Sequence, residues 1–252
     1  MTQPLKVLFY DLETAPLLAH IWSPYDDYVT HDRLVKPGFL LTWSASWRGE
    51  SKIHTGCLTT EEAVEQDDRR IVSELAELIR EADIVVAHNI DKFDLPVFNT
   101  RLLAHRQEPI PPVKSIDTLK LAKGAFRLPY NKLDYLADFL FGDKKIKTDF
   151  DLWKRCYHGD AKALAEMLRY NKKDVVLLKR VFEEILPYVK NLPRLQTLTN
   201  EERCPTCGSA DLIARGHRHT PTGSYTQLRC NGCGRYSRRR TSVAPRPKLV
   251  AL

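Results

Sequence analysis

The chain has 252 residues, 43% of them hydrophobic and 28% charged, which is the composition of a globular protein large enough to bury a core of its own. It contains neither a run of about 18 apolar residues nor a secretory signal, which argues against a membrane span and export, so we expect a cytoplasmic or otherwise intracellular protein. The net charge of +7 resides in residues 201–252, where ten Lys/Arg stand against three Asp/Glu, while residues 1–200 hold 29 of each sign. A basic module on a neutral body indicates nucleic acid as a partner, the alternative being a solvated basic tail.

In chain order, the hydrophobic pattern first predicts a buried strand over residues 5–11, then strands over 39–47 and 52–58 as its antiparallel neighbours. A helix capped by Thr59 or Thr60 follows, as far as about residue 82. The later predicted elements are a strand over 84–87, a helix over 91–106, a strand ending at 117, a helix over 131–141, and one helix or two over 160–186. Strands that alternate with helices predict an α/β domain with a mixed sheet flanked by helices.

The composition changes after this region. Residues 1–192 are predicted to form the main domain, and residues 193–202 to form a linker. A small β module follows over residues 203–240, and residues 241–252 are predicted to be a disordered basic tail.

Two carboxylates stand at the end of the first predicted strand. Asp11 and Glu13 are two residues apart, so their side chains project from the same face of a sheet. Such a pair repels unless a cation lies between the two groups, and the alternative is a pair of acids that face solvent.

Two further segments carry acids at informative spacings. Asp94 lies in the first turn of a predicted helix, within His88-Asn-x-x-x-Phe93-Asp94-x-Pro, where helix capping alone would also favour it. Tyr170 and Asp174 are four residues apart on the last helix and therefore share a face, although a buried tyrosine beside a surface aspartate is a common arrangement.

Taken together, these three motifs resemble one family. Their order resembles the DnaQ-like, or DEDD, 3′–5′ exonucleases of the RNase H-like superfamily, and the Tyr170-x-x-x-Asp174 spacing is similar to the DEDDy branch. The nearest in character are stand-alone nucleases related to the exonuclease domain of family-B DNA polymerases. The resemblance covers about residues 5–187 and includes the stretches at 115–121 and 131–137.

The resemblance implies a role for each matching residue. Asp11, Glu13, Asp94 and Asp174 correspond to carboxylates that bind two Mg²⁺ or Mn²⁺ ions, which suits a site made of hard oxygen ligands. Tyr170 corresponds to the tyrosine that orients the attacking water, since its reference pKa of about 10 makes it a poor base. The weaker candidates for contact with the substrate end are Leu12, Asn89 and Phe93, and Asp117 is expected to support the site rather than to react.

Other aromatic and basic residues allow two readings. Trp43 and Trp47 are expected in the core rather than stacked on bases. Residues 144–154 mix lysines with Trp153 and are either a contact for a single strand or an ordinary solvated loop.

The tail carries two Cys-x-x-Cys-Gly knuckles separated by 22 residues. Four thiolates make a closed tetrahedral site suited to one structural Zn²⁺, and hairpin strands are predicted at 212–215 and 225–229. The predicted ligands are Cys204, Cys207, Cys230 and Cys233. This module looks like a zinc ribbon, similar to those of some transposase and phage proteins, which is the basis for guessing a phage or mobile-element origin. Cys57 and Cys156 are expected to be small buried hydrophobes.

The ribbon is rich in arginine, and two tyrosines lie among these basic residues. Phosphate contact is the expected use, and contact with a protein alone is the alternative. The candidate contacts are Arg229, Arg235 and Arg238.

These inferences predict a metal-dependent 3′–5′ exonuclease, with single-stranded DNA favoured over RNA, whose zinc ribbon aids nucleic-acid binding. One alternative is a structure-specific endonuclease or resolvase of the same fold, which would cut circular DNA. The other is a non-catalytic nucleic-acid-binding protein, which would function without Asp11.

Overall fold

The computed structural model describes residues 5–23, 25, 28–143, 148–190, 192–196 and 201–244. They form two compact units: Lys6–Val181, and a second unit made of Leu5 and the described residues from Phe182 onward. Among the described helices, none combines the length and the apolar character needed to cross a lipid bilayer.

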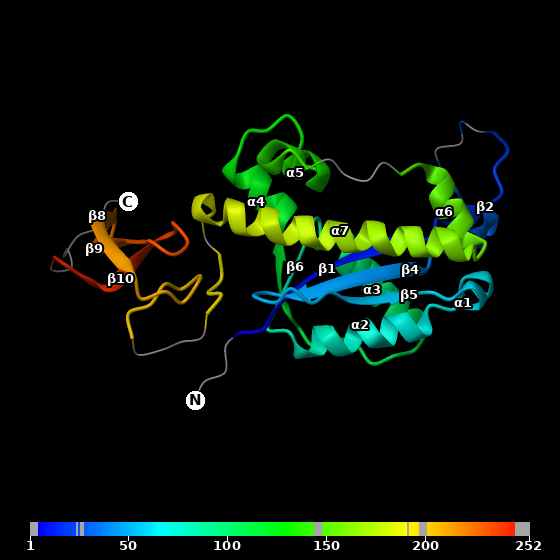
Figure 1. The fold of residues 1–252 in the computed structure, drawn as a ribbon, viewed down its shortest axis with the longest axis horizontal. Helices are drawn as coiled ribbons and strands as arrows, with labels where there is room; N and C mark the ends of the chain where they lie inside the picture. Colours follow the sequence, from blue (N-terminus) through cyan, green and yellow to red (C-terminus); the bar gives the residue numbers. More distant parts are fainter. Residues whose placement is uncertain are drawn as a thin grey trace. The chain divides into compact units, whose positions relative to one another are not determined.

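A five-stranded mixed sheet forms the centre of the first unit, in the order β5-β4-β1-β6-β7 (Figure 1). The middle strand β1 (Val7–Thr14) is antiparallel to β4 (Leu40–Trp47) and parallel to β6 (Ile84–Ala87). The outer strands are β5 (His54–Cys57), antiparallel to β4, and β7 (Lys114–Asp117), parallel to β6. The structure therefore confirms the predicted α/β fold and the antiparallel pairing of β1 with the strand predicted at 39–47. The strand predicted at 52–58 is not a neighbour of β1, because β5 pairs with the far side of β4.

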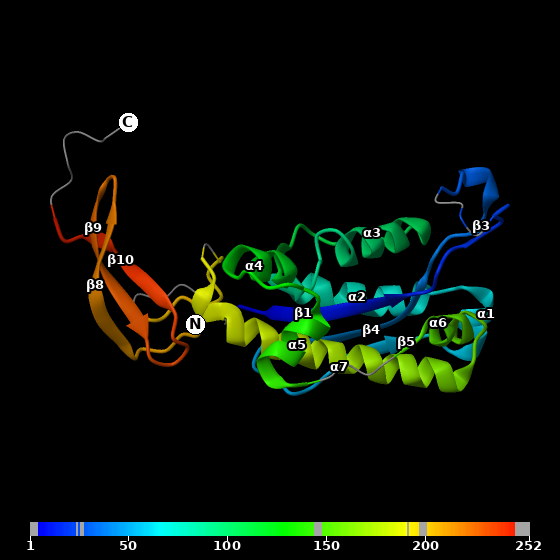
Figure 2. The same ribbon diagram turned by 90° about the horizontal axis from the view of Figure 1, so that it is seen from above.

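Helices cover both faces of this sheet (Figure 2). α2 (Arg69–Glu81) and α3 (Asp94–Ala104) lie on one face, and α7 (Ala161–Ile185), which continues into the second unit, lies on the other. From β1, the first face receives apolar side chains of the main core, Leu8, Tyr10 and Leu12. Because side chains alternate along a strand, Phe9, Asp11 and Glu13 point to the opposite face, toward α7.

The predicted helix from Thr59 or Thr60 to residue 82 is wrong in one respect, because it is two helices. Thr59 caps α1 (Thr60–Glu65) with a capping box, but Gln66 then adopts a left-handed conformation at φ 61°. The break brings Asp68 into the core, where it is fully buried and accepts two hydrogen bonds from the Arg101 guanidinium, each at 2.7 Å. A buried carboxylate needs such partners, and a continuous helix would not present it there.

Two short helices, α4 (Thr118–Ala125) and α6 (Phe150–Tyr157), were not predicted. The helix between them, α5 (Leu133–Phe141), agrees with the prediction. Between β1 and β4 the chain forms an arm with β2 (Leu18–Ala19), a 3₁₀ turn (His31–Arg33) and β3 (Leu34–Lys36). The last helix is one continuous helix. Of the predicted contact segment at 144–154, residues 144–147 lie outside the described residues, and Trp153 lies within α6 rather than in a loop.

The second unit contains a three-stranded antiparallel sheet in the order β10-β9-β8. β8 (Leu212–Thr220) and β9 (Gly223–Cys230) form the predicted hairpin, extended at its tip, and β10 (Tyr236–Ser242) was not predicted as a strand. Predicted disorder from residue 241 is wrong for Thr241 and Ser242, which belong to β10, and residues 245–252 lie outside the described residues. The domain boundaries at 192 and 202 stay predictions.

Candidate functional site

Three carboxylates from two elements converge on the sheet face that is covered by α7. β1 supplies Asp11 and Glu13, and α7 supplies Asp174. One carboxylate oxygen of each lies within 4.8 Å of the other two. Like charges at this distance repel, and a cation between them turns that repulsion into attraction, so the donor set fits a divalent ion.

Asn171 fixes the position of Asp11. Its side-chain amide is buried and donates to the Asp11 carboxylate at 2.7 Å and to the Asp11 backbone carbonyl at 3.2 Å. Asn171 stands three residues before Asp174, so one face of α7 delivers both a carboxylate and the amide that orients a second carboxylate. Sequence reasoning missed Asn171, although its helical spacing from Asp174 was the available signal.

Asp94 lies beside this group at the start of α3. Its side chain is 2% exposed, and its Oδ1 has no hydrogen-bond partner among the described residues. Burial raises the pKa of Asp94 well above its usual value, and the nearby charge of Asp11 raises it further. A buried, incompletely paired carboxylate next to other carboxylates is the environment that a bound cation relieves.

Asp11, Glu13 and Asp174 line an open cleft of about 470 Å³. Its walls come from β1, from the turn after β6, and from the starts of α4 and α5. The lining residues are Asp11, Leu12, Glu13, His88, Asn89, Phe93, Leu119, Lys132, Leu133, Asp134 and Asp174. The predicted contact residues Leu12, Asn89 and Phe93 thus lie at one cleft, although Leu12 is largely buried in the core.

The turn after β6 is held by side chains. Asn89 has a left-handed conformation at φ 73°, which asparagine tolerates better than most residues. Its backbone N–H donates to the Asp117 carboxylate at 2.9 Å. Asp117 also caps α4, which supports the predicted structural role. The ring nitrogens of His88 lie 2.9 Å from the Thr118 hydroxyl and from the Asn131 carbonyl. His88 therefore links the turn after β6 to the start of α4 and to the segment before α5, all of which border the cleft.

Tyr170 does not line this cleft. It is largely buried one turn before Asp174 on α7, and its ring makes an edge contact with Trp153 at 6.1 Å between centroids. Tyr170 stands four positions before Asp174 on the same helix. Its role in orienting the attacking water stays a prediction.

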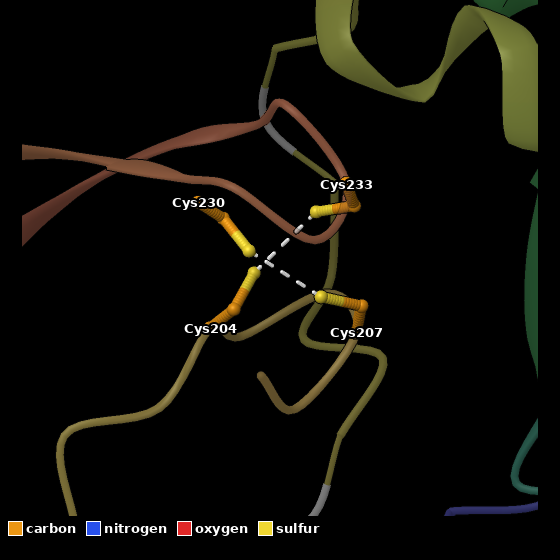
Figure 3. A group of neighbouring side chains, drawn as sticks. All are labelled: Cys204, Cys207, Cys230 and Cys233. Atoms are coloured by element: carbon orange, nitrogen blue, oxygen red, sulfur yellow. Dashed lines mark hydrogen bonds between the residues drawn. The ribbon is translucent and has the colours of Figure 1, made fainter. Parts of the chain in front are cut away.

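The four tail cysteines form a second cluster, in the second unit (Figure 3). All four Sγ atoms lie within 4.8 Å of one another, with 3.6 Å between Cys204 and Cys233 and 3.5 Å between Cys207 and Cys230. A tetrahedral ZnS₄ site with Zn–S distances of about 2.3 Å has sulfurs about 3.8 Å apart, so the cluster has the size of a zinc site.

The two knuckles repeat the same backbone pattern. In each, the amide of the glycine after the second cysteine donates to the carbonyl of the first cysteine: Gly208 to Cys204 at 3.0 Å, and Gly234 to Cys230 at 2.9 Å. Both glycines have positive φ, 79° and 70°, which a side chain would strain. The two Cys-x-x-Cys-Gly segments thus share one local geometry.

The other two thiols, Cys57 and Cys156, have raised pKa values. Burial raises the pKa of Cys57 and raises that of Cys156 to about 12, so both stay protonated near neutral pH. Their predicted place as buried small residues holds for Cys156, while Cys57 is partly exposed. Trp43 and Trp47 pack with the core as predicted.

The predicted contact arginines of the ribbon differ in setting. Arg238 is exposed and stacks over the Tyr225 ring at 3.9 Å, and Arg229 is partly exposed on β9. Arg235 is partly buried, with its guanidinium 3.5 Å from the Leu186 carbonyl.

Comparison with known proteins assigns the fold to a superfamily. Residues 41–186, more than half of the chain, match the family model of the RNase H superfamily. The chain belongs to the RNase H superfamily. The matched segment contains Asp94 and Asp174 but begins after β1, so Asp11 and Glu13 lie outside it.

A search of the solved structures supports this assignment of the fold. The family B DNA polymerase from the hyperthermophilic archaeon Pyrobaculum calidifontis is similar in fold, with a TM-score of 0.54 and 16% sequence identity. The similarity covers 73% of this chain and 25% of the polymerase, so this chain corresponds to about a quarter of that protein. No curated protein sequence matches.

The RNase H superfamily includes nucleases and polymerase exonuclease domains, its nucleases use divalent metal ions, and nucleic-acid binding is expected of its members. This chain of the superfamily carries an acidic cluster in its main unit and a four-cysteine cluster in its second unit.

Proposed function

We propose that the protein is a metal-dependent 3′–5′ exonuclease of the DEDDy type that acts on single-stranded nucleic acid, with DNA favoured over RNA. The observation that carries the proposal is the convergence of Asp11, Glu13 and Asp174 within 4.8 Å, in a cleft of an RNase H superfamily fold. The buried carboxylate of Asp94 beside them supplies the fourth acid of the motif.

Each residue of the site would have a distinct role in hydrolysis. Asp11, Glu13, Asp94 and Asp174 would hold two Mg²⁺ or Mn²⁺ ions, and Asn171 would keep the Asp11 carboxylate in its binding orientation. Bound divalent ions supply a hydroxide-like nucleophile and neutralise charge on the leaving oxygen. Tyr170 would orient the attacking water, because its neutral hydroxyl can donate or accept a hydrogen bond without taking up the proton.

The cleft walls suit the end of a strand. Phe93 is partly exposed and offers a ring face to a terminal base, while Asn89 offers an amide to the sugar or phosphate. Lys132 lines the same cleft and carries a positive charge for a phosphate.

We further propose that the tail is a zinc ribbon with one structural Zn²⁺ on Cys204, Cys207, Cys230 and Cys233. The sulfur separations near 3.5 Å and the paired glycine turns support it. A sheet this small needs such a crosslink to fold.

The test of the exonuclease is degradation of 5′-labelled single-stranded DNA and RNA of equal length, with Mg²⁺ or Mn²⁺. The expected result is a ladder that shortens from the 3′ end and disappears in Asp174→Asn. Asp138→Asn is the matched control, since Asp138 is an exposed acid outside the cleft. Cleavage of circular single strands would instead establish an endonuclease. Binding without cleavage of any strand would establish a binding protein.

A further inference from the structure

One face of the ribbon sheet combines arginines with tyrosines. In the antiparallel pairs, Arg218 lies opposite Tyr225, Arg238 opposite Gln227, and Tyr236 opposite Arg229. Paired residues share a face, and so do residues two apart on one strand. The side chains that share this face are Arg218, Tyr225, Gln227, Arg229, Tyr236 and Arg238.

Part of this face borders a groove of about 410 Å³ within the second unit, a volume in the range of ligand sites. The opposite wall is the segment that follows α7. The lining residues are Pro187, Tyr188, Val189, Lys190, Arg218, Gln227, Arg235, Tyr236, Ser237 and Arg238. Four of them are cationic and none is acidic, so the groove attracts anions.

Two cations of the groove, Arg218 and Arg238, are exposed, and the second is held in place. In the described part of the chain, Arg218 and Arg238 form no ion pair with a carboxylate, whereas Arg239, just outside the groove, is paired with Glu202 at 2.7 Å. Arg238 is ordered by the Tyr225 ring beneath it. A guanidinium that is already positioned loses less side-chain entropy when a phosphate binds.

Two tyrosines lie at the groove with much of their surface exposed. Tyr188 is 65% exposed and Tyr236 is 50% exposed. An acidic peptide needs only the cations, but exposed rings beside cations match a strand that has both phosphates and unpaired bases. In a duplex the base faces are already stacked, so the rings favour a single strand.

We propose that this groove, between Pro187–Lys190 and the ribbon sheet, binds single-stranded nucleic acid, with phosphates on Arg218 and Arg238 and bases stacked on Tyr188 and Tyr236. The choice of nucleic acid rests on the proposed function, and the groove gives it a second binding site besides the carboxylate cleft.

The test measures binding of fluorescein-labelled dT and rU oligonucleotides of equal length to the full chain, in an Asp174→Asn background so that the strand is not degraded. The two oligonucleotides distinguish DNA from RNA. The paired variants are Tyr188→Ala with Tyr236→Ala, and Arg218→Gln with Arg238→Gln. The matched control is Arg215→Gln with Arg240→Gln, which removes two exposed ribbon arginines that do not line the groove.

The two groove variants have different expected signatures. Loss of the rings weakens affinity roughly tenfold per tyrosine and leaves the salt dependence unchanged, because stacking releases no counterions. Loss of the two arginines makes the slope of log K against log salt shallower by about 1.4, from roughly 0.7 per single-strand phosphate contact. The control pair keeps both quantities close to those of the parent chain.

Unchanged affinity in the tyrosine pair would overturn the proposal, because the groove would then be only a cationic patch. So would equal effects of the groove and control arginines. Zinc content is measured for every variant. If the alanine pair loses zinc, Tyr188→Leu, which alters a residue outside the ribbon sheet, gives the same test.

The two proposals can fail separately. A parent chain with Asp174 intact that binds oligonucleotides through the groove but degrades none refutes the exonuclease and keeps the groove. A parent chain that degrades strands while the groove variants bind normally refutes the groove alone.

Discussion

Replacement of Asp174 by asparagine should stabilise the metal-free protein and lose most of that advantage when divalent metal binds. The substitution keeps the shape of the side chain and removes one of three carboxylates whose oxygens lie within 4.8 Å. Two like charges at this distance repel by roughly 3 kcal/mol at an effective dielectric constant of about 20. Asp174→Asn removes two of the three repulsive pairs. Asp11 and Glu13 are partly exposed, so solvent screens much of this, and we expect a net gain of about 1–2 kcal/mol in the metal-free protein.

Divalent metal should cancel most of this gain. A ligand at 100 times its Kd stabilises a protein by about 2.7 kcal/mol. If the lost carboxylate weakens metal binding about tenfold, the variant forgoes about 1.4 kcal/mol of that stabilisation. For a chain of this size, 1 kcal/mol corresponds to about 2–4 °C in Tm.

The assay is thermal unfolding followed by circular dichroism, before and after addition of Mg²⁺ or Mn²⁺. Buffers are stripped with a chelating resin and supplied with one equivalent of Zn²⁺, since a free chelator would remove zinc from the tail. Asp138→Asn should unfold like the parent under both conditions. A lower Tm for Asp174→Asn in metal-free buffer, together with an undiminished metal-induced shift, would refute the reasoning.

Three further predictions concern residues around the two clusters. Asn171→Leu removes the amide that holds Asp11 and should raise the Mg²⁺ concentration for half-maximal cleavage by about 10–100-fold; an unchanged metal requirement would make Asn171 merely structural. Tyr170→Phe keeps the ring contact with Trp153 and should lower kcat about 10²-fold at unchanged KM, measured in single-turnover cleavage; a KM effect alone would point to substrate contact. Cys204→Ser should abolish bound zinc in elemental analysis and weaken strand binding, while metal-dependent cleavage of short oligonucleotides persists; full zinc occupancy in that variant would count against the assignment.

The features that could be predicted from the sequence are those set by short-range geometry. Asp11 and Glu13 share a face because side chains alternate along a strand, and the Cys-x-x-Cys spacing brings the two cysteines of each knuckle close together. Both follow from spacings of a few residues, and both structural expectations agree with the structure.

The features that could not be predicted depend on contacts between distant segments. The helix after Thr59 is interrupted because Asp68 pairs with Arg101, 33 positions later in the chain. Asn171 contacts Asp11 across 160 positions, and no motif marks a lone amide on a helix. The helices α4 and α6 are only 8 residues long, too short for a clear apolar period.

In the proposed function, Asp11, Glu13, Asp94 and Asp174 hold the metal ions that cleave nucleic acid. The most direct measurement is anomalous diffraction at the manganese edge from crystals soaked in Mn²⁺ at a concentration that supports cleavage. We expect two peaks about 4 Å apart among these four side chains. An absence of manganese between these carboxylates, in crystals of protein that degrades nucleic acid under the same conditions, would contradict the proposed function.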